Sequence, residues 1–293
     1  NWHLAGLAKT PIYALMNAKT HWYWGPDGRV ANVYPKAVTV PRHDARRRDI
    51  GLWIEGAEAA FRARSAPTTR RADSRKGPVL ITGAPRSGTS MVAGCLHQAG
   101  LWMGATIRAT PDNPLGFFEN WAIRETILKP NLARSGADPL GVWALPDPDR
   151  LAPDPLLRQR VERALAAQGF AGDGPWGYKE PKLCLVWPTW AEAFPDATWV
   201  LVDRAPEAIV RSCLRTGFMR RHSCDPEFWR CFVNRYRDRM DDLSRSAPNV
   251  VRISADALVG GARDPIRELA TALGLSWTDR CEARIAPKHF TRF

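Results

Sequence analysis

The stretch Val79–Ser90, which reads VLITGAPRSGTS, decides the fold. Its first four residues form a short apolar run typical of a buried strand. A glycine-rich loop, Gly83–Ser90, follows, and Met91–Leu101 then has apolar side chains at helical spacing. In such a strand–loop–helix unit, backbone N–H groups and the positive end of the helix dipole face the same point. The stretch therefore predicts an anion-binding loop. The alternative interpretation is a tight turn that binds nothing.

The loop differs from a nucleoside-triphosphate P-loop at one position. Gly83, Gly88 and Ser90 fit the pattern G-x-x-x-x-G-K-[ST], but Thr89 stands in place of the lysine that contacts the β- and γ-phosphates. The nearest cation is Arg86, inside the loop. The sequence therefore favours an anion whose phosphates are arranged differently from those of ATP or GTP. A P-loop kinase-like phosphotransferase stays the alternative, to be supported by activity with ATP and Mg²⁺.

Strand and helix patterns alternate over the rest of the chain. This alternation predicts an α/β fold with a central parallel sheet flanked by helices. Further strands are expected at residues 176–179, 197–203 and 250–253, and further helices at residues 50–64, 183–193, 206–215 and 263–273.

Composition and charge narrow the function classes. The 293 residues are 45% hydrophobic and 25% charged, which excludes a disordered or fibrous chain, and no apolar run approaches the ~20 residues of a membrane span. The net charge is +12, and residues 1–77, with 14 basic and six acidic residues, carry +8 of it. Such a surplus indicates either a solvated basic face or a surface for a polyanion, a membrane or a nucleic acid.

The cysteines are scattered and show no metal-ligand spacing, so we expect free thiols and no bound metal. Cys95 and Cys184 lie in apolar contexts and are expected to be buried. Cys224 and Cys231 are the candidates for a disulfide if the compartment is oxidising.

Two segments together resemble the PAPS-dependent sulfotransferases, where PAPS is 3′-phosphoadenosine 5′-phosphosulfate. Pro85–Ser90 is similar to their loop for the 5′-phosphosulfate, and Arg204 with Ser212, eight residues later, matches their pair of 3′-phosphate contacts. A guanidinium offers a charge-assisted, bidentate fork to a phosphate, which suits this role. The resemblance implies a P-loop-like sulfotransferase architecture, PAPS as donor and adenosine 3′,5′-bisphosphate as product. The donor-binding residues that it implies are Pro85, Arg86, Ser87, Gly88, Thr89, Ser90, Arg204 and Ser212.

Two more segments resemble bacterial members of that family. Gly177–Leu185 contains a Lys-Glu-Pro sequence, and by resemblance its Lys179 approaches the transferred sulfate. Asn113–Asn120 is similar to an Asn-Pro-x-Gly-aromatic-Phe-Glu segment placed where the acceptor binds. The resemblance implies an in-line displacement in which Lys179 and Arg86 stabilise the leaving and bridging oxygens. The alternative for Lys179 is that it only neutralises Glu180 on the surface.

Three residues are candidates for the general base. Glu119 is the first, because a carboxylate near a phosphosulfate and an aromatic wall is expected to have a raised pKa. His222, after two arginines, is the second. Glu180 is the third, although we expect it to orient Lys179. A purely structural role stays the alternative for Glu119 and for His222.

The resemblance covers about residues 78–275. The chain lacks the Arg-Lys-Gly segment of the cytosolic sulfotransferases, and Arg284 and Lys288 are the candidate substitutes at the 3′-phosphate. We therefore expect a donor-binding domain over residues 78–293. Residues 1–77 are expected to form a basic, aromatic-rich extension, joined by a polar linker at residues 65–77, that packs on or near the acceptor cleft.

The acceptor is expected to be a small molecule, a glycan or a glycolipid, because the basic surplus favours an anionic partner. We expect no nucleic-acid partner, since no recognition motif is present. The expected location is the bacterial cytoplasm, with the basic N-terminal part able to associate with the inner face of the membrane. A non-enzymatic binder of polyanions or nucleic acid is the remaining alternative, and a steep salt dependence without turnover would support it.

Overall fold

The computed structural model describes residues 13–16, 38–41, 77–110, 113–151 and 153–285. The chain divides into two compact units, Asn1–Ser74 and Arg75–Phe293. In the first unit, strands β1 (Tyr13–Met16) and β2 (Val38–Pro41) pair in parallel. The helix expected at residues 50–64 and most of the expected linker lie outside the described residues.

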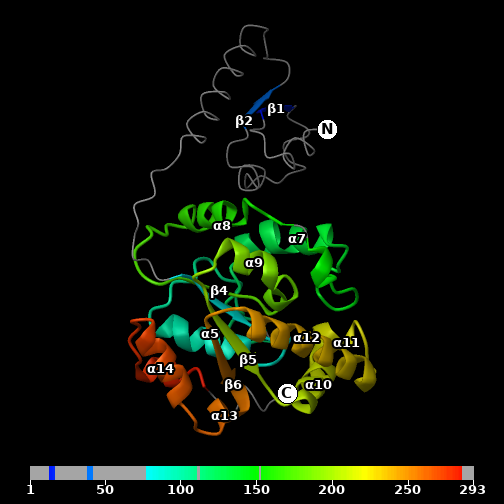
Figure 1. Ribbon diagram of the computed structural model, residues 1–293, viewed down its shortest axis with the longest axis vertical. Helices are drawn as coiled ribbons and strands as arrows, with labels where there is room; N and C mark the ends of the chain where they lie inside the picture. The colour runs from blue at the N-terminus through cyan, green and yellow to red at the C-terminus, as the bar shows by residue number, and fades with distance from the viewer. Residues whose placement is uncertain (1–12, 17–37, 42–76, 111–112, 152, 286–293) are drawn as a thin grey trace. The chain divides into compact units, whose positions relative to one another are not determined.

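The second unit is built on a four-stranded parallel sheet (Figure 1). Its strands are β3 (Val79–Thr82), β4 (Gly177–Lys179), β5 (Thr198–Asp203) and β6 (Val250–Ser254), in the order β4-β3-β5-β6. All four predicted strands are present, and the predicted α/β class is confirmed. Because the strands are parallel, the segments that leave β3, β4 and β5 emerge at one edge of the sheet.

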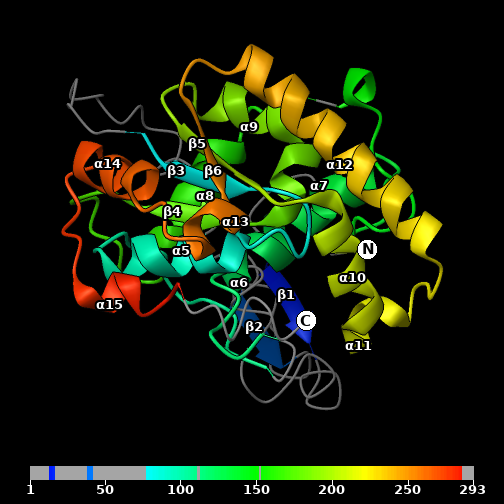
Figure 2. The same ribbon diagram turned by 90° about the horizontal axis from the view of Figure 1, so that it is seen from below.

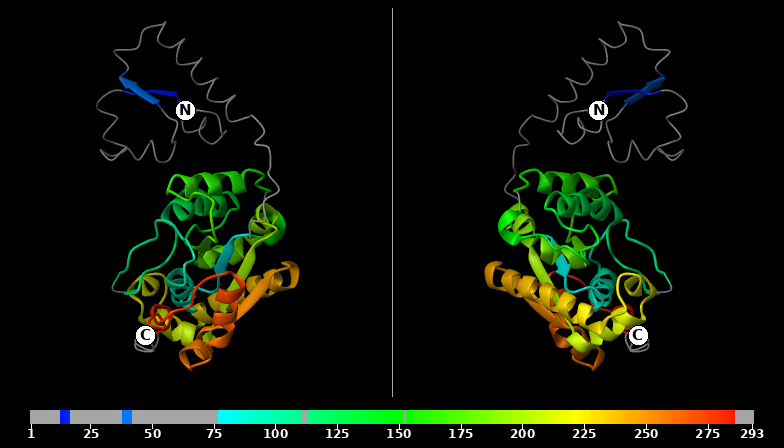
Figure 3. Two further views of the ribbon diagram at one scale, coloured as in Figure 1. Left: turned by 90° about the vertical axis from the view of Figure 1, so that its left-hand side faces the viewer. Right: turned by 90° about the vertical axis from the view of Figure 1, so that its right-hand side faces the viewer.

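Helices bury both faces of this sheet, as the uninterrupted apolar runs in β3 and β5 predict. Val79 and Ile81 belong to a buried cluster with residues of α5, α13 and α14, whereas Leu80 belongs to the cluster with residues of α8, α9, α10 and α12. Figure 2 shows helices on both sides of the sheet. Figure 3 shows α7 and α8 beyond the β4 edge, at the opposite end from α13. The helix bounds are α5 (Thr89–Gln98), α6 (Trp121–Ile123), α7 (Lys129–Arg134), α8 (Leu157–Ala166), α9 (Trp187–Ala193), α10 (Pro206–Arg215), α11 (Gly217–Arg220), α12 (Pro226–Ser246), α13 (Ala255–Val259), α14 (Asp264–Ala272) and α15 (Asp279–Glu282).

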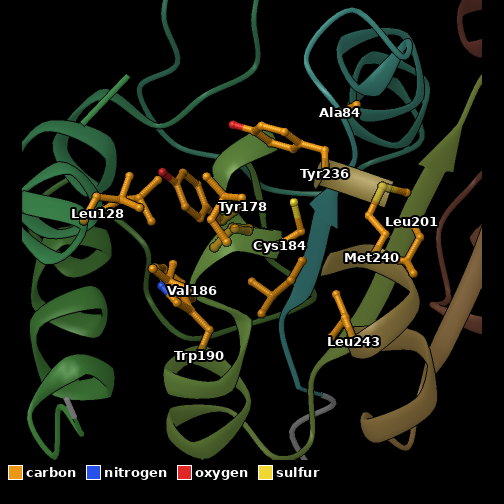
Figure 4. Close-up of a cluster of buried hydrophobic side chains, with 14 of the residues drawn as sticks. Ala84, Leu128, Tyr178, Cys184, Val186, Trp190, Leu201, Tyr236, Met240 and Leu243 are labelled. Carbon is orange, nitrogen blue, oxygen red and sulfur yellow. The ribbon is translucent and has the colours of Figure 1, made fainter. Parts of the chain in front are cut away.

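The larger core cluster lies on the α9–α12 side of the sheet (Figure 4). Tyr178 stacks on Trp190 at a ring-centroid distance of 5.4 Å, and both side chains are fully buried. Met240 and Leu243 of α12 pack in the same cluster. This core holds β4 through Tyr178 and so positions Lys179, the last residue of the strand.

The helix predicted at residues 183–193 forms as two pieces. A 3₁₀ turn, η5 (Pro181–Leu185), comes first, and α9 starts at Trp187 with Pro188 in its first turn. Proline lacks an N–H and its ring collides with the carbonyl four residues earlier, so one continuous helix through Pro188 is disfavoured. The helices predicted at residues 206–215 and 263–273 are α10 and α14.

All six cysteines are free, and the expected burial of Cys95 and Cys184 is confirmed. Burial raises the pKa of the thiols of Cys95 and Cys184 to about 12. Cys224 and Cys231 are exposed and do not pair with each other in this structure. Within the described residues, no helix has the length and apolar character to cross a membrane, and no group of three or more His, Cys, Asp or Glu side chains is arranged to hold a metal.

Candidate active site

The loop after β3 adopts a strained backbone that opens toward α5. Arg86 has φ of 72°, in the left-handed region that costs a non-glycine residue free energy, and such residues are frequent at functional sites. Gly88 has φ of 99° and precedes the first residue of α5 without a side-chain cap. Because the first N–H groups of a helix have no partner within it, those of Thr89 and Ser90 are available to an anion.

The interior of the loop is lined by Gly83 and Ser87. A Cβ atom on Gly83 would lie 2.6 Å from the Val202 carbonyl oxygen and 2.8 Å from Ser87 Oγ, so only glycine fits. The Ser87 hydroxyl is buried and has no hydrogen-bond partner. A buried hydroxyl without a partner is costly, and an anion held in the loop would supply the missing acceptor.

Three of the predicted donor-site residues meet beside this loop. Arg86 Nε donates to Ser212 Oγ at 3.0 Å, across 126 residues of sequence. Arg204 Nη1 donates to the Arg86 carbonyl oxygen at 3.1 Å, and its Nε lies 3.6 Å from Asp256 Oδ1. Arg204 directly follows β5, and Ser212 lies on α10, which begins two residues later. The structure thus brings together the residues that the sequence placed at the two ends of one nucleotide.

The electrostatics of this cluster favour an anion. Burial lowers the pKa of Arg204, Asp256 opposes the shift, and the positive charges of Arg86 and Arg211 lower the pKa further. The guanidinium groups of Arg86, Arg204 and Arg211 are therefore close enough to repel one another, and Asp256 is the carboxylate that offsets the charge of Arg204. Arg211 was missed by the sequence analysis, although it directly precedes Ser212.

Lys179 leaves the neighbouring strand end and forms a buried ion pair. Its Nζ donates to Glu119 Oε1 at 2.8 Å, and the side chains are 2% and 8% exposed. The alternative that Lys179 neutralises Glu180 on the surface is wrong. Phe118, just before Glu119, has φ of 58°, a second strained residue next to a charged group of the site.

Glu180 does not orient Lys179, contrary to our expectation. Successive residues of an extended backbone point to opposite sides, so the two side chains diverge. Glu180 is fully buried and pairs with Lys182 Nζ at 2.5 Å and with Arg124 Nε at 3.4 Å. The partner of Lys179 is Glu119, which comes from a distant segment.

The expected raised pKa of Glu119 is also wrong. Burial alone would raise it, but the positive charges of Lys179, Lys182 and Arg124 outweigh burial and hold the pKa of Glu119 below 4.5. Arg124 Nε lies 3.2 Å from Glu119 Oε2. Glu119 is therefore an ionised carboxylate with both oxygens facing cations.

Arg124 is a further residue that the sequence analysis missed. Its Nε lies between Glu119 and Glu180, and so links the partners of Lys179 and Lys182. It opens a π-helical turn, η3 (Arg124–Leu128), between α6 and α7. Short π-helical insertions are frequent at functional sites. The one feature of the sequence that pointed to Arg124 is its position, five residues after Glu119.

The other candidates occupy varied positions. Ser90 Oγ donates to the Phe117 carbonyl at 3.3 Å and accepts from Asn113 Nδ2, which ties α5 to the Asn113–Asn120 segment. Arg284 Nη1 donates to the Leu115 carbonyl at 3.2 Å, so its recorded contact lies on that segment. Lys288 lies outside the described residues. Thr89 is buried at the start of α5, and Pro85 lies in the loop.

His222 lies in an aromatic setting. Its ring is 5.0 Å from that of Phe218 and 6.4 Å from that of Trp143, between ring centroids. Among the described residues, none of its ring contacts is to the phosphate-loop or Lys179 groups. No contact in this arrangement supports the predicted role of His222 as a base.

The strand register places the arginine cluster and the Lys179–Glu119 pair close to the same loop. Ile81 of β3 is the register partner of Lys179, and Thr82 is that of Leu201 on the other side. Ligands of parallel α/β sheets bind at such carboxyl ends. The arginine cluster and the buried Lys179–Glu119 pair therefore lie at the carboxyl end of the same sheet, and the arginines can hold an anion.

Comparisons with known proteins identify similar sequences and structures. The model of the sulfotransferase family matches residues 78–279. A search of curated proteins finds no match. Similar solved structures include the sulfotransferase STF1 from Mycobacterium tuberculosis H37Rv (15% identity, 72% of this chain and 71% of that chain, TM-score 0.45). A second is the sulfotransferase domain of the Synechococcus PCC 7002 olefin synthase (14% identity, 77% of this chain and 84% of that chain, TM-score 0.45). A third is the sulfotransferase STF9 from Mycobacterium avium (15% identity, 78% of this chain and 71% of that chain, TM-score 0.43).

Proposed function

The chain belongs to the sulfotransferase family, and on that premise we propose that it transfers a sulfuryl group from PAPS to a hydroxyl or amine of an acceptor. The observation that carries the proposal is the convergence of Arg86, Ser212 and Arg204 beside the glycine-rich loop. These residues come from three segments, and their shared positive charge suits a phosphate.

In this proposal the donor spans the loop and α10. The 3′-phosphate accepts from Arg204 and Ser212, and the 5′-phosphosulfate lies against Ser87 and the first N–H groups of α5. The unpartnered Ser87 hydroxyl supports the second placement, because it is buried and faces the loop interior. Arg86 lies between the two ends and contacts Ser212 directly.

The transfer is an in-line displacement at sulfur. A bond from the acceptor oxygen or nitrogen to sulfur forms, the bond from sulfur to the bridging oxygen breaks, and adenosine 3′,5′-bisphosphate leaves with the electron pair. Lys179, which Glu119 holds in place as a cation, stabilises the negative charge that grows on the bridging oxygen, together with Arg86. Because little covalent chemistry falls to the protein, alignment and charge stabilisation supply the rate enhancement.

Glu119 is the proposed acceptor of the proton from the attacking group. It is ionised at neutral pH, as a base must be, and it lies next to the lysine that faces the sulfate. Its lowered pKa makes it a weak base, so we place the proton transfer late, after the new bond to sulfur has largely formed. For the acceptor we propose an anionic small molecule, glycan or glycolipid, on the strength of the net charge of +12, and for the location the cytoplasm.

Calorimetric titration with adenosine 3′,5′-bisphosphate, without metal, tests the donor site. We expect Arg204→Ala to weaken binding by ~10- to 150-fold, because a hydrogen bond to a charged group contributes ~1.5–3 kcal/mol. The matched control is Arg230→Ala, which removes an exposed arginine that pairs with Glu207 and Glu227 and should leave binding unchanged. Binding of ATP with Mg²⁺ in preference to the bisphosphate would refute the proposal. Mass spectrometry of acceptors incubated with PAPS then identifies the sulfated product.

A further inference from the structure

The loop that follows α7 is rigidly built. The Asp138 carboxylate accepts from the backbone N–H groups of Leu140, Val142 and Trp143 at 2.9, 3.0 and 3.2 Å. Burial opposes ionisation of Asp138, but these three donors outweigh it and lower its pKa. Gly141 lies between Leu140 and Val142, and its carbonyl accepts a hydrogen bond from Oη of the buried Tyr236 at 2.9 Å. The conformation of this loop is therefore fixed by internal bonds.

This rigid loop nevertheless presents apolar side chains to solvent. Leu140 is 38% exposed and Trp143 is 52% exposed. Phe218 of α11, 42% exposed, joins Trp143 through the ring of His222, which lies between them. Among the described residues only four large hydrophobic side chains are this exposed, and these are three of them. We call the group Leu140, Trp143, Phe218 and His222 the aromatic lip.

Three exposed arginines lie within three residues of Phe218 in the chain. Arg215, Arg220 and Arg221 are all exposed, and none forms a salt bridge with a carboxylate of the described residues. The Arg221 guanidinium lies 5.8 Å from the centre of the Phe218 ring. Figures 1 and 2 show α11 beside α10 at the periphery of the fold.

The carboxylates of the neighbouring segments are held by other groups. Asp138 accepts from three backbone N–H groups, and Asp225 accepts from the N–H of Glu227 as the cap of α12. Glu207 and Glu227 both pair with Arg230. The guanidinium groups of Arg215, Arg220 and Arg221 therefore remain available to an anion.

We propose that the aromatic lip docks on the surface of a bilayer that contains anionic lipids. Exposed aromatic residues flanked by basic ones suit the headgroup region, where rings lie at the boundary with the acyl chains and arginines meet lipid phosphates. A soluble polyanion would satisfy the arginines but would leave Leu140, Trp143 and Phe218 in water. A bilayer surface offers phosphates to the arginines and an apolar boundary to the exposed rings. The inference is independent of the proposed sulfuryl transfer.

Flotation of the full chain with lipid vesicles tests the inference. We expect partition into vesicles of phosphatidylcholine mixed with phosphatidylglycerol, and little partition into phosphatidylcholine alone. Neutralising Arg215, Arg220 and Arg221 to Gln should reduce partition ~100-fold, since each basic residue near such a surface contributes ~1 kcal/mol. Trp143→Ala with Phe218→Ala should reduce it at least ~10-fold through lost apolar contact. The matched control is Trp121→Ala, which removes a tryptophan that is 50% exposed but outside the lip.

Five results would overturn the inference, and the first four concern partition and self-association. These are equal partition into both kinds of vesicle, unchanged partition of the lip variants, an equal loss in Trp121→Ala, and self-association of the wild type in sedimentation that the lip variants abolish. Displacement from vesicles by heparin that requires only the arginines, and not the two aromatic rings, would assign the surface to a soluble glycan instead. Circular dichroism melts of each variant show that the fold is retained, so a negative result stays interpretable.

Discussion

Replacing Glu119 with glutamine should destabilise the protein and remove its activity together. The substitution keeps the size of the side chain but removes the negative charge that faces Lys179 Nζ at 2.8 Å and Arg124 Nε at 3.2 Å. Both Glu119 and Lys179 are buried, so water cannot replace the lost charge. The lysine then has to stay charged without its partner or give up its proton, and either outcome costs free energy.

The magnitude follows from the burial of the pair. Removing one partner of a buried salt bridge costs about 3–5 kcal/mol. The amide oxygen of the new glutamine can still accept a hydrogen bond from Lys179, so we expect a cost near the lower end, about 3 kcal/mol. For a unit of about 200 residues, each kcal/mol lowers Tm by roughly 2–4 °C, so we expect a fall of about 6–12 °C. The control is Glu125→Gln, which breaks partly exposed pairs with Lys129 and Arg124 but keeps the Glu119–Lys179 pair, and it should cost about 0.5 kcal/mol.

The dependence on pH gives the sharpest form of this prediction. Because the folded pKa of Glu119 lies below its ordinary value of 4.5, its stabilisation is present above pH 4.5 and is lost as the pH falls through the folded pKa. The difference in Tm between wild type and Glu119→Gln should therefore be full at neutral pH and shrink below pH 4.5.

The measurement is a set of thermal melts followed by circular dichroism, with calorimetric titration of adenosine 3′,5′-bisphosphate beside them. A Glu119→Gln variant as stable as Glu125→Gln, or equally destabilised at neutral and acid pH, would refute the reasoning. So would strict additivity with Lys179→Met, because contacting partners must show a coupling free energy. Retained binding of the bisphosphate together with lost transfer would separate the role of Glu119 from that of the arginine cluster.

Two further predictions concern the loop and the cysteines. Gly83→Ala should abolish bisphosphate binding in calorimetry, because the added Cβ meets the Val202 carbonyl at 2.6 Å; wild-type affinity would contradict the described loop. In labelling with a chromogenic disulfide reagent, the exposed thiols of Cys224 and Cys231 should react first, and the four buried thiols only after denaturation. Burial raises the pKa of Cys213 to about 12, so rapid labelling of more than two thiols in the native protein would be inconsistent with this burial.

The sequence predicted the sheet and the anion-binding loop because both depend on local patterns. Val79–Thr82 and Thr198–Asp203 are apolar runs of strand length, and Gly83 and Gly88 have the spacing of a phosphate loop. The 21-residue helix α12 was not predicted, although it buries residues at helical spacing. Its polar residues outnumber the buried ones, and this hid the apolar stripe.

The partners of charged groups were beyond prediction because they depend on tertiary contacts. Lys179 is adjacent to Glu180 in sequence, yet its partner is Glu119, 60 residues earlier. The same distant contacts reversed the expected shift in the pKa of Glu119, since the charges of Lys182 and Arg124 reach it only in the folded chain. Local sequence indicated the candidate residues, and the fold decided how they are paired.

The hydrogen bond from Arg86 to Ser212 has a thermodynamic consequence for ligand recognition. It joins the glycine-rich loop to α10, and Arg204 adds a second link through the carbonyl of Arg86. A ligand that engages only one end must still disturb groups that belong to the other. For the proposed bisphosphate, the two phosphates therefore contribute cooperatively, and the affinity of the whole exceeds what its separate 3′- and 5′-monophosphates would predict. The affinity would then depend on the distance between the two phosphates of the ligand as well as on its total charge.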